Sequence, residues 1–131
     1  MARILVVDDE DPIRETLEAL LRHAGHKVVV AVNGEEAVKL HRQAPVDLMI
    51  TDIHMPEKEG LTTIMDLHRG TPRVKIIAMT GSTIKDYLNW ARKLGARRTI
   101  AKPFSGPEIL QLVEEVLNSP DEEEESDGKK G

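Results

Sequence analysis

Three aspartates lie just past short apolar segments of the sequence, where their side chains could do chemistry. Asp8 and Asp9 follow the apolar residues 4–7, and Asp52 lies just past the apolar residues 48–50. If the fold brings them together, three carboxylates repel one another unless a cation compensates them. Mg2+ (or Mn2+) prefers carboxylate and phosphate oxygens, and the sequence has no cysteine and no histidines at zinc-binding spacing. The aspartates therefore predict a divalent-cation site.

A hydroxyl group and a cation follow two further short segments that are expected to be strands. Thr80 comes directly after residues 74–79, and Lys102 comes directly after residues 97–101. Phosphoryl transfer needs a nucleophile, a metal ion, and donors or cations that stabilise charge on the phosphoryl oxygens. Asp52 could supply the nucleophile, Lys102 the cation and Thr80 the donor. The expected chemistry is the transfer of a phosphoryl group to an aspartate.

The segments that must position these residues alternate along the chain. Short apolar runs predict buried strands, and segments with apolar residues at helical spacing follow each of them. This strict alternation is typical of a doubly wound α/β fold, a five-stranded parallel sheet with five helices on two faces. The predicted strands are residues 4–7, 27–32, 48–50, 74–79 and 97–101, and the predicted helices are residues 12–24, 34–43, 61–68, 84–94 and 106–118.

The residues at the strand ends favour one strand order. The strand at 27–32 ends in the plain turn Asn33-Gly34, whereas the other four end in candidate site residues, so it is expected at an edge. The flavodoxin-like order 2-1-3-4-5 places it there and puts the ligand-binding switch point between the first and third strands. Asp8, Asp9 and Asp52 would then meet in one crevice.

Capping residues predict where three of the helices begin. Asp11 is expected to cap the first helix, with Pro12 in its first turn. Two pairs have the spacing of a capping box, in which each side chain bonds to the backbone of the other residue. These pairs are Asn33 with Glu36 and Ser105 with Glu108.

Taken together, these motifs resemble the receiver domain of a two-component response regulator, of the chemotaxis-regulator-like single-domain type. The resemblance covers residues 1–118 and rests on Asp8-Asp9, Asp52 with Met55-Pro56 and Gly60, Thr80, and Lys102-Pro103-Phe104. It implies that Asp52 accepts a phosphoryl group from the phosphohistidine of a sensor histidine kinase or a histidine phosphotransfer protein. Such a domain catalyses only its own aspartyl phosphorylation and dephosphorylation, so no other enzymatic activity is expected.

The resemblance also implies roles for the residues around Asp52. Mg2+ would be held by Asp9, Asp52 and the backbone carbonyl of His54, with Asp8 acting through water, while Thr80 and Lys102 would bind the phosphoryl oxygens. His54 and Ser82 occupy positions that modulate the lifetime of the phosphoryl group in the family. The Lys102-Pro103 peptide bond is expected to be cis.

Signal output in this family passes from the threonine to a face made by the fourth helix, the fifth strand and the fifth helix, which binds a downstream protein. The family often has an aromatic switch residue three positions before the lysine, and here that position is Thr99. A threonine buries less area on rotation than an aromatic ring, so the output signal is expected to be weaker or built differently. Trp90 in the fourth helix is either the rim of the core or a docking residue on the output face.

Composition limits the remaining possibilities. The chain has 131 residues, a net charge of −5 and only three aromatic residues, which disfavours binding to nucleic acid. No apolar run reaches the length of a membrane span and no leader precedes residue 4, so the protein is expected to be cytoplasmic. Residues 1–118 form the expected receiver domain, without a DNA-binding domain after them.

Residues 119–131 are expected to form an acidic, disordered tail, since they hold six acidic residues against two lysines. A basic patch precedes the last helix, and an acidic partner or this tail could dock on it. The residues of the patch are Arg92, Lys93, Arg97, Arg98 and Lys102.

Two alternative functions remain open from the sequence. A magnesium-dependent phosphatase with an aspartate nucleophile would use similar groups, but haloacid-dehalogenase-like enzymes have Asp-x-Asp where this chain has Asp52-Ile53-His54. A pseudo-receiver would keep the fold as a docking scaffold without being phosphorylated. The complete set of site residues favours a receiver that is phosphorylated over both alternatives.

Overall fold

The computed structural model describes residues 2–53, 74–81, 92–93 and 95–120 of the chain. The predicted helix at 61–68 lies outside the described residues, and so does the helix at 84–94 apart from residues 92 and 93. The described strands are β1 (Arg3–Val7), β2 (Lys27–Ala31), β3 (Leu48–Asp52), β4 (Lys75–Thr80) and β5 (Arg98–Ala101), and the helices are α1 (Asp11–His23), α2 (Gly34–Gln43) and α5 (Gly106–Leu117).

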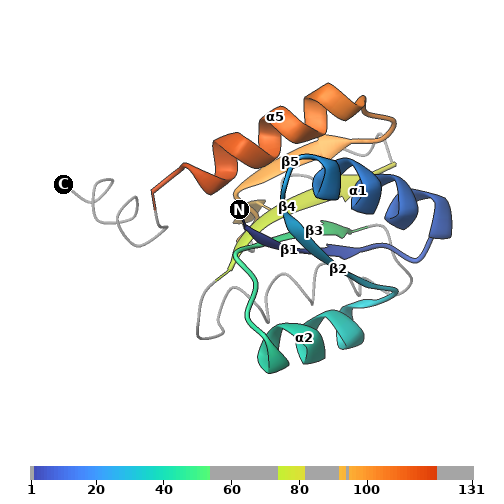
Figure 1. The fold of residues 1–131 in the computed structure, drawn as a ribbon, viewed down its shortest axis with the longest axis vertical. Helices are drawn as coiled ribbons and strands as arrows, with labels where there is room; N and C mark the ends of the chain where they lie inside the picture. The colour runs from blue at the N-terminus through green and yellow to red at the C-terminus, as the bar shows by residue number, and fades with distance from the viewer. Residues whose placement is uncertain (1, 54–73, 82–91, 94, 121–131) are drawn as a thin grey trace.

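The five strands form one parallel sheet in the order β2-β1-β3-β4-β5, which confirms the predicted strand order. β2 lies at an edge, and β1 and β3 are neighbours in the interior of the sheet (Figure 1). All five residues of β3 are buried, as expected for a strand that is covered on both faces. The carboxyl ends of β1, β3, β4 and β5 therefore lie side by side at one edge of the sheet.

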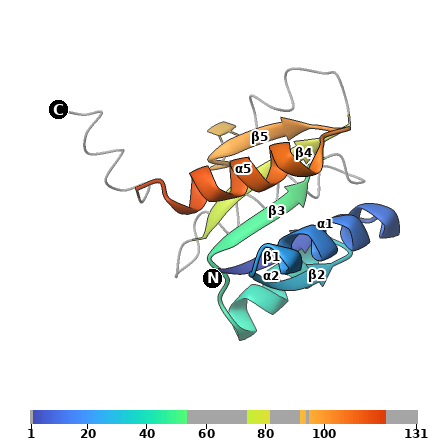
Figure 2. The ribbon, with the colours of Figure 1, turned by 45° about the horizontal axis from the view of Figure 1, so that its top comes forward.

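Helices cover both faces of the sheet. α1 and α5 pack side by side on one face and α2 lies on the opposite face, as Figures 1 and 2 both show. Alternate residues of each strand point to the two faces, so Ile4 and Val6 pack under α1 and α5, whereas Leu5 and Val7 pack over α2. Burying each aliphatic side chain fully stabilises the folded state by roughly 1.5–3 kcal/mol. The two cores therefore hold the carboxyl edge of the sheet in place.

Helix caps agree with the sequence at two helices and differ at one. The backbone N–H of Glu36 donates to Asn33 Oδ1 over 2.8 Å, but Glu36 Oε1 accepts the N–H of Val32 rather than that of Asn33. The reciprocal capping box predicted for both pairs therefore forms only at α5, between Ser105 and Glu108. Asp11, however, is the first residue of α1 rather than its cap. The N-cap is Glu10, which makes no side-chain cap bond, and its backbone N–H donates to Asp8 Oδ1 over 2.9 Å.

Of the helices in the described part of the chain, none has the length and hydrophobicity that a transmembrane segment requires.

Candidate functional site

The sheet brings four of the candidate residues to its carboxyl edge. Asp8 directly follows β1 and Lys102 directly follows β5, while Asp52 and Thr80 are the last residues of β3 and β4 rather than residues beyond them. In the register of the sheet, Asp52 pairs with Met79, the residue before Thr80. The backbone N–H of Lys102 donates to the carbonyl of Thr80 over 2.7 Å. Four neighbouring strands thus deliver one carboxylate, hydroxyl or ammonium group each.

Asp8, Asp9 and Asp52 form an acidic cluster at this edge. One carboxylate oxygen from each residue lies within 4.8 Å of the others, and Asp8 and Asp52 are buried while Asp9 is exposed. Three hard oxygen donors with one side open to solvent suit Mg2+ or Mn2+, which bind a few carboxylates and keep several waters. The donor set therefore fits the predicted cation. His54, whose backbone carbonyl is the fourth expected ligand, lies outside the described residues.

Lys102 supplies a positive charge in contact with this acidic cluster. Its Nζ lies 2.7 Å from Asp8 Oδ2 and 3.3 Å from Asp52 Oδ2, and Glu10 Oε1 is 3.5 Å away. The lysine side chain is only 13% exposed, so these interactions are screened less by salt than surface ion pairs are. One ammonium group thus compensates two buried carboxylates.

Two opposing effects act on the pKa of Lys102. Burial would lower the pKa, but the hydrogen bond to Asp8 and the charges of Asp52 and Asp8 together outweigh burial and raise the pKa above its ordinary value of 10.5. Lys102 is therefore a cation across the physiological pH range. A permanent cation next to Asp52 can bind anionic oxygens of a group that arrives there.

The raised pKa of Lys102 predicts a loss of stability at alkaline pH. A lysine whose pKa is raised by folding stabilises the folded state fully below its unfolded value of 10.5, and this contribution disappears as the pH rises through the higher folded value. The difference in unfolding free energy between the wild type and Lys102→Met should therefore be constant at neutral pH and shrink above pH 10.5. Urea unfolding in EDTA across this range measures it, and a difference that grew with pH would contradict the prediction.

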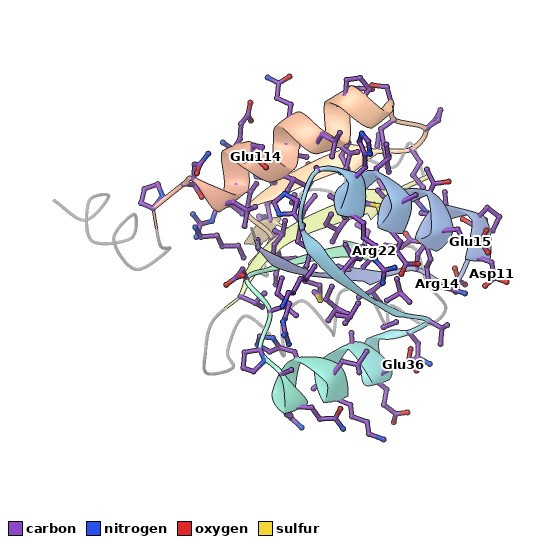
Figure 3. All side chains as sticks on the ribbon, in the orientation of Figure 1. Asp11, Arg14, Glu15, Arg22, Glu36 and Glu114 are labelled. Carbon is purple, nitrogen blue, oxygen red and sulfur yellow. The ribbon has the colours of Figure 1, made fainter. Side chains whose placement is uncertain are left out.

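Two residues that sequence reasoning missed organise the loop after β1. Arg14 Nη1 donates to the backbone carbonyl of Asp8 over 2.7 Å, and Nη2 of the same guanidinium pairs with Asp11. Figure 3 shows Arg14 and Asp11 together at the N-terminal end of α1. Glu10 is the second missed residue, since it lies near Lys102. Arg14 is one turn from Glu10 and Asp11 along α1, and that helical spacing is the signal that could have pointed to it.

The remaining candidate residues are only partly described. Thr80 is fully buried at the end of β4, and Thr99 is half-buried on β5 opposite Ala78. The Lys102-Pro103 peptide bond is cis, in agreement with the expectation from the sequence. Ser82, Trp90, Met55-Pro56 and Gly60 lie outside the described residues, as His54 does.

Solved response regulators share this fold. The chemotaxis response regulator CheY4 of Vibrio cholerae aligns with a TM-score of 0.81 and 28% identity, covering 88% of this chain and 98% of that chain. The fold is thus that of a CheY-like α/β domain. The sequence matches the response regulator receiver domain family over residues 4–114, and the chain belongs to this family.

Two relatives show how the match extends along whole proteins. A response regulator receiver protein of Anaeromyxobacter sp. is 36% identical over 112 residues, which cover 86% of this chain and 47% of the relative. Protein CcdB of Bacillus subtilis is 33% identical over 118 residues, which cover 89% of this chain and 98% of CcdB. The chain therefore spans about half of the first relative and nearly all of the second.

Membership of the family defines the general role of the chain. It is a receiver domain of a two-component response regulator, a signalling module rather than a classical enzyme. Such a domain implies a kinase as partner.

Proposed function

We propose that Asp52 is the phosphoacceptor of this receiver and takes a phosphoryl group from a phosphohistidine with the help of Mg2+. The observation that carries the proposal is the position of Asp52: its Oδ2 lies 3.3 Å from Lys102 Nζ, and its carboxylate belongs to the acidic cluster at the carboxyl edge of the sheet. The donor of the group is a sensor histidine kinase or a histidine phosphotransfer protein.

In the proposed transfer, a carboxylate oxygen of Asp52 attacks the phosphorus in line with the bond to the histidine nitrogen. The new P–O bond forms as the P–N bond breaks, and the electron pair stays on the imidazole, which takes up a proton. Asp8, Asp9 and Asp52 would hold Mg2+, which supplies positive charge to the phosphoryl oxygens when bound. No other cofactor is needed, because the acceptor is part of the protein itself.

Lys102 changes partners in this mechanism. Before transfer its ammonium group bonds to Asp8 and Asp52, at 2.7 and 3.3 Å. Conversion of Asp52 to an acyl phosphate removes the charge of its carboxylate and places negative charge on the phosphoryl oxygens, so Nζ follows that charge. The hydroxyl of Thr80, which ends the neighbouring strand, donates to another phosphoryl oxygen.

The signal of phosphorylation would leave the site through β4 and β5, at whose carboxyl ends Thr80 and Lys102 lie. Thr80 and Lys102 are linked through the backbone bond between β4 and β5, so a shift of either changes the face formed by the fourth helix, β5 and α5. A downstream protein would bind to that face. Thr99 on β5 takes the place of an aromatic switch residue, so the change in buried area is smaller than an aromatic side chain would give. We place the end of the receiver near Asn118, the C-cap of α5.

The test is intact-protein mass spectrometry after incubation with acetyl phosphate, with Mg2+ or with EDTA. One phosphoryl group should be added to the wild type with Mg2+, little or none with EDTA, and none to Asp52→Asn. Asp11→Asn is the matched control, because Asp11 lies in the same part of the chain but not in the acidic cluster. An adduct on Asp52→Asn, or none on folded wild type, would overturn the proposal. Steady release of phosphate from many general phosphate esters would support a phosphatase instead.

A further inference from the structure

The chain that leaves α5 is held against the beginnings of two strands. Lys75 Nζ, at the start of β4, donates to the carbonyls of Leu117 and Ser119 over 3.1 and 2.8 Å. Arg97, just before β5, donates to Ser119 Oγ over 2.9 Å and also to the carbonyl of Pro120. The bond to Leu117 also satisfies the last carbonyl of α5. Together, these bonds fix the position of Pro120 beside Arg97, at the end of the sheet opposite to Asp52.

Basic residues lie on this side of the molecule, and we call Arg92, Lys93, Arg97 and Arg98 the basic surface. Arg92, Lys93 and Arg98 are exposed, and no ion pair between two described residues includes any of these three. In Figures 1 and 2, the short described segment at 92–93 and the start of β5 lie on the same side of the molecule as the C-terminal end of α5. The basic surface therefore presents several positive charges on the side of the molecule where Pro120 lies, and one of them, Arg97, bonds to Pro120.

The sequence that follows Pro120 is strongly acidic. Six of the seven residues from Asp121 to Asp127 are aspartate or glutamate. An extended chain spans at most about 3.5 Å per residue, so all six carboxylates stay within roughly 25 Å of the fixed Pro120. Attachment to the same chain gives such a segment an effective concentration on the order of millimolar at a nearby surface.

We propose that the acidic segment, residues 121–127, binds the basic surface of its own chain. Opposite charge and direct attachment both favour this occupant. A separate polyanion such as a nucleic acid would have to approach a protein whose net charge is −5, whereas the acidic segment is already adjacent. The interaction is electrostatic between exposed groups, so it weakens as salt is added.

The basic surface overlaps the proposed output face. Arg92 and Lys93 are helical and fall within the predicted fourth helix, and Arg98 lies on β5; these are two of the three elements of the output face proposed above. A bound acidic segment would compete with a downstream protein for that face. This consequence rests on the proposed function, but the binding of the segment does not, so a test without phosphorylation keeps the two separate.

Paramagnetic relaxation enhancement tests the binding directly. The chain has no cysteine, so Ser126→Cys provides a single attachment site for a nitroxide label and leaves all charges of the acidic segment in place. In low salt, the amide signals of Arg92, Lys93 and Arg98 should lose most of their intensity, whereas those of α2, on the other face of the sheet, should keep theirs. About 0.5 M NaCl, at which the Debye length is about 4 Å, should restore the lost intensity.

Charge variants decide whether the effect comes from the named residues. Changing Glu122, Glu123, Glu124 and Glu125 to glutamine in the labelled chain should abolish most of the intensity loss, and Arg98→Gln should reduce it. Lys39→Gln, an exposed lysine on α2, is the matched control and should have no effect. Equal broadening across the protein, or broadening unchanged by the glutamine substitutions, would overturn the proposal. So would broadening that appears only between labelled and unlabelled copies, since it would indicate binding to a second chain.

Discussion

Replacing Lys102 with methionine is expected to lower the free energy of unfolding by about 3 kcal/mol in metal-free buffer. Methionine keeps most of the apolar volume of the lysine stem but removes the ammonium group that lies 2.7 Å from Asp8 and 3.3 Å from Asp52. Both carboxylates are buried, and removing one partner of a buried ion pair leaves its charge uncompensated. Urea unfolding of the two proteins in EDTA measures the difference.

Magnesium should partly reverse the effect of Lys102→Met. Without the ammonium group, the charges of Asp8, Asp9 and Asp52 repel one another fully, so a divalent cation relieves more repulsion in the variant than in the wild type. The stabilisation gained on adding Mg2+ should therefore be larger for Lys102→Met. Lys39→Met, at an exposed position on α2, should show neither the loss nor the larger gain. Equal gains in all three proteins would show that Lys102 does not interact with the cation site.

The arrangement of the strands could be predicted because its determinants are local in the sequence. Apolar runs such as residues 48–50 mark buried strands, and polar residues at their ends mark the carboxyl edge of the sheet. The order of the strands then followed from a single contrast, between the plain turn after the second strand and the site residues after the others. Once the order is known, the meeting of Asp8, Asp52 and Lys102 follows from the register of the sheet.

The contacts that could not be predicted join long side chains to backbone carbonyls. Lys75 bonds to Leu117 and Ser119, more than forty positions along the chain, and no spacing rule marks such a pair. The expected cap of α1 was also wrong: the helix begins at Asp11 itself, whose side chain pairs with Arg14, and the N-cap is Glu10. In both cases the outcome depends on which of several nearby polar groups is better placed, which requires coordinates.

Histidines illustrate the same limit. The sequence shows five histidines without a metal-binding pattern, but it does not show what each one contacts. His26 Nδ1 accepts the N–H of Ala2 over 3.1 Å, and its Nε2 lies 3.2 Å from Glu114 of α5. His41 is buried and accepts the N–H of Val46 through Nδ1. Both side chains therefore tie chain segments together in the described part of the protein.

Replacing Asp9 with asparagine is expected to weaken Mg2+ binding about tenfold or more, which corresponds to about 1.4 kcal/mol. Asp9 is the exposed member of the acidic cluster and has no described ion pair with Lys102, so its charge is free to serve the cation. A ligand that binds only the folded state stabilises it by RT ln(1 + [L]/Kd). At saturating Mg2+, the stabilisation measured by urea unfolding should therefore be about 1.4 kcal/mol smaller than in the wild type.

The comparison with Asp11→Asn separates this effect from a general loss of negative charge. Asp11 lies two residues further on, pairs with Arg14, and contributes no oxygen to the acidic cluster. Its replacement should slightly destabilise α1, because a negative charge in the first turn favours a helix, but it should leave the stabilisation by Mg2+ unchanged. Asp9→Asn should do the opposite: in EDTA it should not destabilise the protein, since it removes repulsion from Asp8 and Asp52. If both variants lost the same amount of Mg2+ stabilisation, the cation would be attracted by the overall charge of the loop rather than bound by Asp9.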